Sequence, residues 1–239
     1  MKRIHLDETD STNNYLRESK SNHANEDLLI TTDFQTSGRG QKNNTWESAK
    51  GENLLFSFLI HPTHIVAHEQ FCISEAISLA IQQTLLERTR DVKIKWPNDI
   101  YIDNHKVCGI LVENSLVGST INDCIIGCGV NINQDRFFSD APNPVSLRQA
   151  TGQEWNREQI LTSIMRNFDH FYSMTRNNRE TLHSKYLESL YRRGEEHLYS
   201  DANGEFRATI IDVAPSGQLT LRDSNGTNRK YAFKEVRFV

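Results

Sequence analysis

The stretch VKIKWPNDIYIDNHKVCGILVE, residues 92–113, decides the fold. It holds three apolar segments separated by Pro97-Asn98-Asp99 and Asp103-Asn104, and residues of these types favour turns. We therefore predict strands of one sheet, joined partly by hairpins. A stiff turn and a hairpin lysine also put Asp99 and Lys106 where both can face one cavity, although the same pattern fits a plain turn with a solvated lysine.

Apolar patterns on both sides of this stretch predict more strands and several helices. Runs that fit further strands lie at 4–6, 28–34, 54–60 and 123–132. The side chains of Asp10-Ser11-Thr12 can cap a helix that runs to Ser19. Apolar residues at helical spacing predict helices over 68–89 and over 157–172, the second capped by Asn156, and a further helix is predicted near 179–190. These elements place the fold in the α+β class, with a mixed sheet and helices.

The C-terminal part of the chain has a different pattern. From about Gly194, short alternating segments at 204–213, 217–223 and 230–236 are separated by Gly, Asn and Pro residues typical of tight turns. We predict a small all-β barrel docked closely on the preceding domain.

Composition excludes several classes of protein. The 239 residues carry a formal net charge of −4, with a pI near 6.1, so the surface has no general attraction for nucleic acid or anionic membranes. The longest apolar run, Leu54 to Ile60, is too short to cross a bilayer, and the first residues lack the apolar core of a signal peptide. We expect a soluble, cytoplasmic protein.

The four cysteines, Cys72, Cys108, Cys124 and Cys128, lie within apolar runs, where free thiols pack as small hydrophobic groups. We expect no disulfide framework. A cysteine metal site is not expected either, because Cys124 and Cys128 lack a nearby histidine pair. The patterns of zinc proteases and of serine hydrolases are also absent from the sequence.

A glycine-rich segment follows the predicted strand at 28–34. In Gln35-Thr-Ser-Gly38-Arg39-Gly40-Gln41, glycines let backbone N–H groups approach an anion, and Arg39 adds a permanent positive charge. The segment is a candidate phosphate cradle, but a tight turn explains it as well, since it fits neither the Walker nor the dinucleotide pattern. It opens a polar stretch over 36–53 that is long for a loop.

Two more glycines, Gly127 and Gly129, lie at the end of an apolar strand followed by Asn131 and Asn133. They fit a close strand crossing or a flat ligand laid against the backbone.

In combination and in this order, these segments resemble the biotin protein ligases. The matching residues are Asp10-Ser11-Thr12-Asn13, Gln35, Gly38-Arg39-Gly40, Trp46, Lys95 to Asp99, Lys106, Gly109 to Glu113, and Gly127 to Asn133. The resemblance implies a class II aminoacyl-tRNA synthetase-like catalytic domain at 1–190 and an SH3-like barrel at 191–239. It also implies that biotin and ATP, with Mg²⁺, form biotinyl-5′-AMP, and that biotin then passes to a lysine of a biotin carboxyl carrier domain.

The resemblance also implies roles for single residues. Arg39 and Lys106 would be catalytic, with Lys106 bridging the biotin carboxylate and the α-phosphate, and the 36–53 loop would close over the product and be mobile without ligand. Biotin would be bound by Ser11, Thr12, Asn13, Gln35, Gly38, Arg39, Gly40, Gln41, Lys106, Gly109, Gly127 and Gly129. ATP would be bound by Arg39, Trp46, Asn98, Asp99, Lys106 and Asn131, with Mg²⁺ on its phosphates.

Two departures from the family pattern matter. Some members carry a basic run after the GRG motif, whereas here Gln41 to Asn44 holds only Lys42 as a positive residue, so we expect Lys42 to assist Arg39. Members that also act as repressors have a DNA-binding domain before the first motif, and only nine residues precede Asp10, so we expect no binding to DNA. The oligomeric state stays open.

Two other functions remain as alternatives. A lipoate or octanoate ligase shares the acyl-adenylate chemistry, but the polar Ser11, Thr12, Asn13 and Gln35 favour the ureido ring of biotin. The other alternative is a regulator or adaptor whose barrel binds nucleic acid or peptide, and the acidic composition and the lack of an aromatic–basic run argue against RNA binding.

Overall fold

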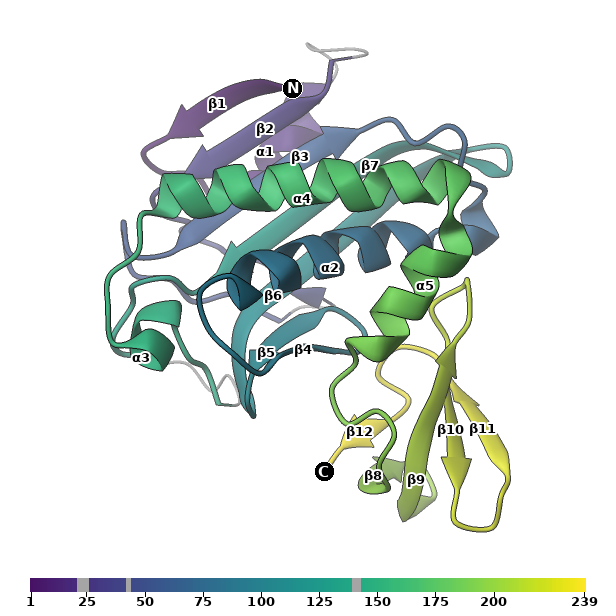
Figure 1. The fold of residues 1–239 in the computed structure, drawn as a ribbon. Coiled ribbons are helices and arrows are strands. Elements are labelled where there is room, and N and C mark those ends of the chain that lie inside the picture. The colour runs from purple at the N-terminus through teal and green to yellow at the C-terminus, as the bar shows by residue number, and fades with distance from the viewer. Residues whose placement is uncertain (21–25, 42–43, 139–142) are drawn as a thin grey trace.

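The computed structural model describes residues 1–20, 26–41, 44–138 and 143–239. Seven strands form one mixed sheet in the order β1-β2-β3-β7-β6-β5-β4, with β1 and β2 parallel and every other neighbouring pair antiparallel (Figure 1). Their bounds are β1 (Lys2–Leu6), β2 (Leu28–Thr32), β3 (Leu54–Ile60), β4 (Val92–Lys95), β5 (Asp99–Ile102), β6 (His105–Val117) and β7 (Thr120–Val130). The strands predicted from apolar runs are confirmed, and 54–60 matches β3 at both ends.

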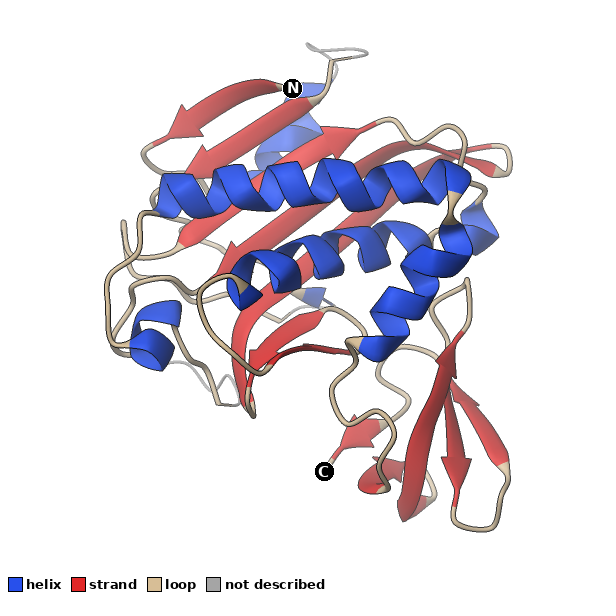
Figure 2. Ribbon diagram, in the orientation of Figure 1, coloured by secondary structure: helices blue, strands red, loops and turns tan. Residues whose placement is uncertain are grey.

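Helices cover both faces of this sheet (Figures 1 and 2). α2 (Phe71–Leu86) and α4 (Arg157–Asn177) lie side by side in front of the sheet, and α1 (Thr12–Ser19) lies behind it. Side chains alternate along β7 accordingly, because Ile126 and Cys128 belong to the large core while Ile125 belongs to the smaller cluster beside α1. Gly127 and Gly129 therefore lie on the α1 face.

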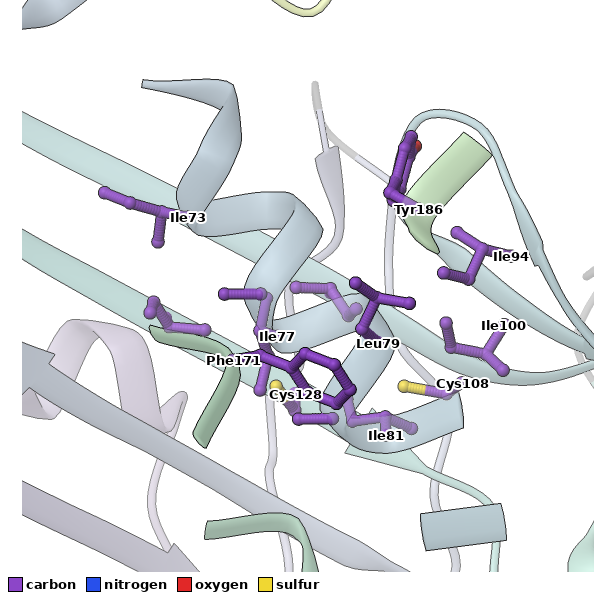
Figure 3. Packing of buried hydrophobic residues seen from close by; sticks show 14 of the residues in the cluster. Ile73, Ile77, Leu79, Ile81, Ile94, Ile100, Cys108, Cys128, Phe171 and Tyr186 are labelled. Carbon is purple, nitrogen blue, oxygen red and sulfur yellow. The ribbon is translucent and has the colours of Figure 1, made fainter. Parts of the chain in front are cut away.

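The large core lies between α2, α4 and the sheet. Figure 3 shows Ile77 and Ile81 of α2 close to Cys108, Cys128 and Phe171, which come from β6, β7 and α4. The four cysteines are buried and free, as predicted. Because this core is continuous with apolar residues of the C-terminal strands, the two parts of the chain are closely docked.

The register of the β6–β7 pair shapes the α1 face of the sheet. Gly109 pairs with Gly129, and Leu111 pairs with Gly127. Three of these four positions lack a side chain, so the surface of the sheet is shallow here. This strip of backbone forms the floor of the site described below.

Helix ends show which local signals were readable in the sequence. Asn156 caps α4, since its side chain accepts a hydrogen bond from the Gln159 backbone N–H at 3.1 Å. α2 begins at Phe71 rather than at 68, because Ala67–Glu69 forms a separate 3-10 turn, η3. A short helix that was not predicted, α3 (Leu147–Thr151), has a capping box formed by Ser146 and Gln149. None of the helices in the described residues is both long and apolar enough to cross a membrane.

After α5 (Arg179–Glu188), five strands form a second, antiparallel sheet in the order β11-β10-β9-β8-β12. They are β8 (His197–Asp201), β9 (Gly204–Val213), β10 (Leu219–Asp223), β11 (Asn228–Tyr231) and β12 (Arg237–Phe238). The sequence did not predict β8 or β12, which are short and partly polar. The Trp96 indole N–H donates to the Gly217 carbonyl at 2.9 Å and joins this sheet to the β4–β5 turn.

Candidate active site

A cavity of about 1080 Å³ opens on the α1 face of the large sheet. Its walls come from the start of α1, parts of 35–41 and 44–47, the β4–β5 turn, β6, β7 and the last residues of the chain. Segments far apart in sequence thus meet at one place. Of the predicted site residues that the structure describes, all line this cavity except Gly38.

At one end of the cavity, buried polar side chains form a network around the start of α1. Gln35 Oε1 accepts hydrogen bonds from the Thr12 backbone N–H at 2.8 Å and from the Thr12 hydroxyl at 3.1 Å. Ser57 Oγ, from β3, lies 2.6 Å from both Thr12 Oγ1 and Asn13 Oδ1. Thr12, Asn13 and Ser57 are each less than 5% exposed, so this network is fixed before any ligand arrives.

The same network corrects one expectation about α1. Ser11 occupies the capping position, but its side chain makes no capping hydrogen bond, and Gln35 supplies an acceptor to the helix instead. Ser57 was not predicted as a site residue. Its only signal in the sequence is that it interrupts an apolar strand.

The GRG segment pairs with residues 44–46, and Arg39 and Thr45 form an antiparallel β-bridge. The Gly40 N–H donates to the Asn44 carbonyl at 2.7 Å, and the Gly38 carbonyl accepts from the Trp46 N–H at 2.9 Å. A Cβ at Gly38 would lie 2.5 Å from the Trp46 carbonyl oxygen, so this glycine is required by backbone crowding. Gly38 and Gly40 thus flank a β-bridge rather than occupying a tight turn, while Arg39 presents a cation at the cavity. Lys42 lies outside the described residues.

Trp46 covers the glycine floor of the cavity. A Cβ at Gly129 would lie 2.3 Å from Trp46 Cε2, and one at Gly109 would lie 2.8 Å from Trp46 Cζ3. The flat group that lies against these strands is thus the Trp46 ring, not a ligand. The indole N–H of Trp46 is buried and has no hydrogen-bond partner among the described residues. Gly127 instead makes room for Asn13, whose Oδ1 would lie 2.0 Å from an added Cβ.

Charged groups gather at the other side of the cavity. Lys106 Nζ lies 2.7 Å from Asp99 Oδ1, which confirms that these two residues face one cavity, and 5.7 Å from the centre of the Trp46 ring. Lys95 Nζ donates to the Tyr101 hydroxyl at 2.9 Å and lies 5.3 Å from the centre of the Phe238 ring. Burial lowers the pKa of Lys95. The cavity thus holds a local positive region on a protein whose net charge is negative.

The last strand also reaches the cavity, which the sequence did not predict. Its lining includes Lys234, Val236, Arg237 and Phe238, and Lys234 Nζ lies 3.5 Å from the Gln41 carbonyl. These residues reach the site only because the second sheet docks on the β4–β5 turn, and no local sequence signal reports that docking.

A second group of possible metal ligands lies away from this cavity. His5, Asp7 and Asp33 bring ligand atoms within 4.8 Å of one another. Arg157 Nη1 forms an ion pair with Asp33 Oδ1 at 3.0 Å, so a metal ion bound by Asp33 would have to compete with Arg157. We assign no function to this group.

Comparison with known proteins places the chain in a family. A model described as the biotin/lipoate A/B protein ligase family matches residues 6–131. The chain is 28% identical over 237 residues to the bifunctional ligase/repressor BirA of Bacillus subtilis, covering 96% of this chain and 72% of that protein. It is 30% identical over 215 residues to biotin–protein ligase 2 of Arabidopsis thaliana, covering 82% of this chain and 63% of that protein.

Solved structures show the same fold. The biotin protein ligase of Aquifex aeolicus in complex with biotin and ATP superposes with a TM-score of 0.82 at 24% identity, over 100% of this chain and 99% of that one. The enzyme of Leishmania major in complex with biotinyl-5-AMP gives a TM-score of 0.68 at 20% identity, over 97% and 98% of the two chains. Because the family model matches more than half of the chain, the chain belongs to the biotin/lipoate A/B protein ligase family.

Proposed function

We propose that the protein is an ATP-dependent biotin protein ligase. It joins the biotin carboxylate to the α-phosphate of ATP, releases pyrophosphate, and passes biotin from biotinyl-5′-AMP to a lysine of a biotin carboxyl carrier domain. One observation carries the proposal: a single cavity combines a buried hydrogen-bonding network, a glycine floor and a group of cations. The relative named biotin–protein ligase 2 supports it.

The buried network fits the ureido ring of biotin. Such a ring offers two N–H donors and one carbonyl acceptor, and a buried site that leaves any of them unpaired loses affinity. Thr12, Asn13 and Gln35 provide hydroxyl and amide groups of both kinds at the cavity wall. A lipoyl or octanoyl chain has no polar head that would use them.

The cations fit the chemistry of the first step. A carboxylate that attacks a phosphate is repelled by it, so fixed positive groups are needed to stabilise the pentavalent transition state. Arg39, from the segment after β2, and Lys106, from β6, both line the cavity. We assign to them the stabilisation of this transition state. When Lys106 engages the reacting groups, Asp99 remains beside it as a counter-charge.

Mg²⁺ binds oxygen ligands, and few of them need come from protein when phosphates supply the rest. Asn131 Oδ1 is a buried acceptor without a hydrogen-bond partner among the described residues, and the Asp99 carboxylate lines the same cavity. These two residues fit an ion carried in on the phosphates of ATP. The ion would neutralise phosphate charge there.

We place the catalytic domain at 1–190 and the barrel domain at 191–239. The carrier lysine must enter the cavity to reach the adenylate, and Arg237 and Phe238 of β12 are among the residues that line it. We infer that the carrier domain docks beside these residues of the barrel domain.

The test is isotope exchange between pyrophosphate and ATP in the presence of one acid at a time. Biotin is expected to support exchange, whereas lipoate and octanoate are expected to support little. Exchange with lipoate or octanoate but not biotin would make the protein a sibling ligase, and no exchange with any of the three would reject the adenylating function.

A further inference from the structure

The carboxylate of Glu113 lies beside the candidate active site and connects two of its side chains, Asn13 and Arg39, with Arg17 of α1 outside the lining. Glu113 Oε2 accepts from Asn13 Nδ2 at 2.8 Å and from Arg17 Nη2 at 2.7 Å, while Glu113 Oε1 lies 3.3 Å from Arg39 Nη2. Its side chain is 27% exposed. Glu113 follows Gly109 and Leu111 on the same face of β6, so it stands next to the lined cavity without being part of its lining.

The bond to Asn13 fixes the direction of an amide at the cavity wall. An amide carries a donor and an acceptor of nearly the same shape, and only its partners decide which way it points. Glu113 accepts from Asn13 Nδ2, which turns Asn13 Oδ1 toward Ser57 and Gly127. Without an acceptor at Glu113, this orientation would lose one of its two supports.

The ion pair with Arg39 holds the positive charge of its guanidinium in place. Arg39 Nη1 donates to Asn14 Oδ1 at 2.8 Å, and Arg17 Nη1 donates to the same oxygen at 3.0 Å. Two guanidinium groups thus share one neutral acceptor and would repel each other without a nearby negative charge. Glu113 supplies that charge, because it bonds to both of them.

We propose that Glu113 is the positioning residue of this site, holding the Arg39 guanidinium and the Asn13 amide in place for a carboxylate ligand. The proposal rests on the proposed function for the identity of that ligand. Glu113 does not itself touch the reacting atoms. In Glu113→Gln the amide oxygen can still accept from Asn13, but the negative charge beside Arg39 is lost. The effect of this variant on catalysis therefore passes through Arg39 and is absent when Arg39 is absent.

The first measurement does not depend on the reaction. Side-chain NMR of the ligand-free protein, with the Arg39 signal assigned by Arg39→Lys, reports whether the guanidinium is held or rotates freely. The Arg39 signal is expected to show restricted rotation in the wild type and in Glu69→Gln, and free rotation in Glu113→Gln. Glu69 is the matched control, because it is a carboxylate of similar exposure (35%) paired with another arginine, Arg179. Unchanged Arg39 rotation in Glu113→Gln would overturn the proposal.

The second measurement is a double-mutant cycle on biotin-dependent pyrophosphate exchange. Glu113→Gln is expected to lower kcat/KM for biotin about tenfold, the scale of one charge-assisted bond. Adding Glu113→Gln to Arg39→Ala is expected to cause no further loss beyond about twofold. Losses that multiply in the double variant would contradict positioning through Arg39.

Arg17→Met separates this role from packing of α1. It removes the second cation but leaves the Glu113 contacts with Arg39 and Asn13. Exchange activity within about twofold of wild type is expected. A loss as large as that of Glu113→Gln would mean that anchoring of α1 is the function of Glu113. Absence of exchange in the wild type would reject the proposed function, and the NMR result would still decide whether Glu113 positions Arg39.

Discussion

Lys106 Nζ and Asp99 Oδ1 form an ion pair of 2.7 Å across the β5–β6 hairpin, with only 23% and 21% of the two side chains exposed. The two residues are brought together by the hairpin, since Asp99 pairs with Gly109 and Tyr101 pairs with Lys106 in the β5–β6 register. The lysine is thus held at the cavity by a local element of the fold, independent of the distant segments that complete the site.

Replacing Lys106 by Met tests its catalytic role. The substitution keeps the length of the side chain but removes the positive charge, and it should slow adenylate formation by about 10²–10³-fold. Lys185→Met, at an exposed position of α5, is the control and should leave the rate unchanged. The measurement is biotin-dependent exchange of pyrophosphate at saturating ATP. A Lys106→Met enzyme as fast as the control would remove Lys106 from the mechanism.

Gly127→Ala and Gly129→Ala form a matched pair on one strand. The new Cβ would crowd Asn13 at Gly127 and Trp46 at Gly129, so the two changes disturb opposite ends of the site. Gly127→Ala should raise the KM for biotin more than that for ATP, and Gly129→Ala should do the reverse. Steady-state kinetics with each substrate varied in turn checks this. Equal effects of both variants on both KM values would contradict the assignment of the two ends.

His183 should make stability depend on pH. Its Nδ1 lies 2.7 Å from the buried Glu75 carboxylate of α2, and its Nε2 lies 3.0 Å from Asp212 of β9. The hydrogen bond to Glu75 is the largest cause that raises the pKa of His183 above 6.5. A raised pKa in the folded state means stabilisation that is complete below the unfolded pKa and is lost as pH rises through the folded one.

Urea unfolding of wild type and His183→Gln between about pH 6 and about pH 9 measures this effect. The difference in the free energy of unfolding between the two proteins should be largest at the acidic end and should shrink toward the alkaline end. A difference that stays constant over this range would show that His183 contributes through packing alone.

The cysteines should be unreactive in the native protein. Burial raises the pKa of Cys72 to about 12 and also raises the pKa of the other three thiols well above the usual value, so little thiolate forms near neutral pH. A thiol reagent should label the cysteines only after denaturant is added, and the rate should follow unfolding. Rapid labelling of the folded protein at about pH 8 would contradict this burial.

Apolar patterning predicted most of the fold because the large sheet is buried on both faces. β2 and β3 consist wholly of buried residues, so they appear in the sequence as mostly apolar runs, with only Thr31, Thr32 and Ser57 as polar residues. β8 and β12 were missed because they are short, and β12 is ordered by pairing with β8 rather than by its own sequence. α3 was missed although Ser146 and Gln149 carry a capping-box signal.

The site was only partly predictable for a related reason. Motif residues such as Lys106 and Gln35 were identified because their order along the chain is distinctive. The contacts of Glu113 with Asn13 and Arg39, and the entry of Arg237 and Phe238 into the cavity, depend on segments that meet only in the folded chain. The Gly40 amide was a candidate donor to an anion, but it already donates to the Asn44 carbonyl.

The most direct test of the central claim is to identify what the enzyme makes from biotin. The protein is incubated with biotin, ATP and Mg²⁺, and the bound small molecule is examined by mass spectrometry before and after addition of a biotin carboxyl carrier domain. We predict biotinyl-5′-AMP on the enzyme before addition, and afterwards biotin on one lysine of the carrier. An enzyme that forms no biotinyl-5′-AMP, but forms the adenylate of lipoate or octanoate under the same conditions, would contradict the account.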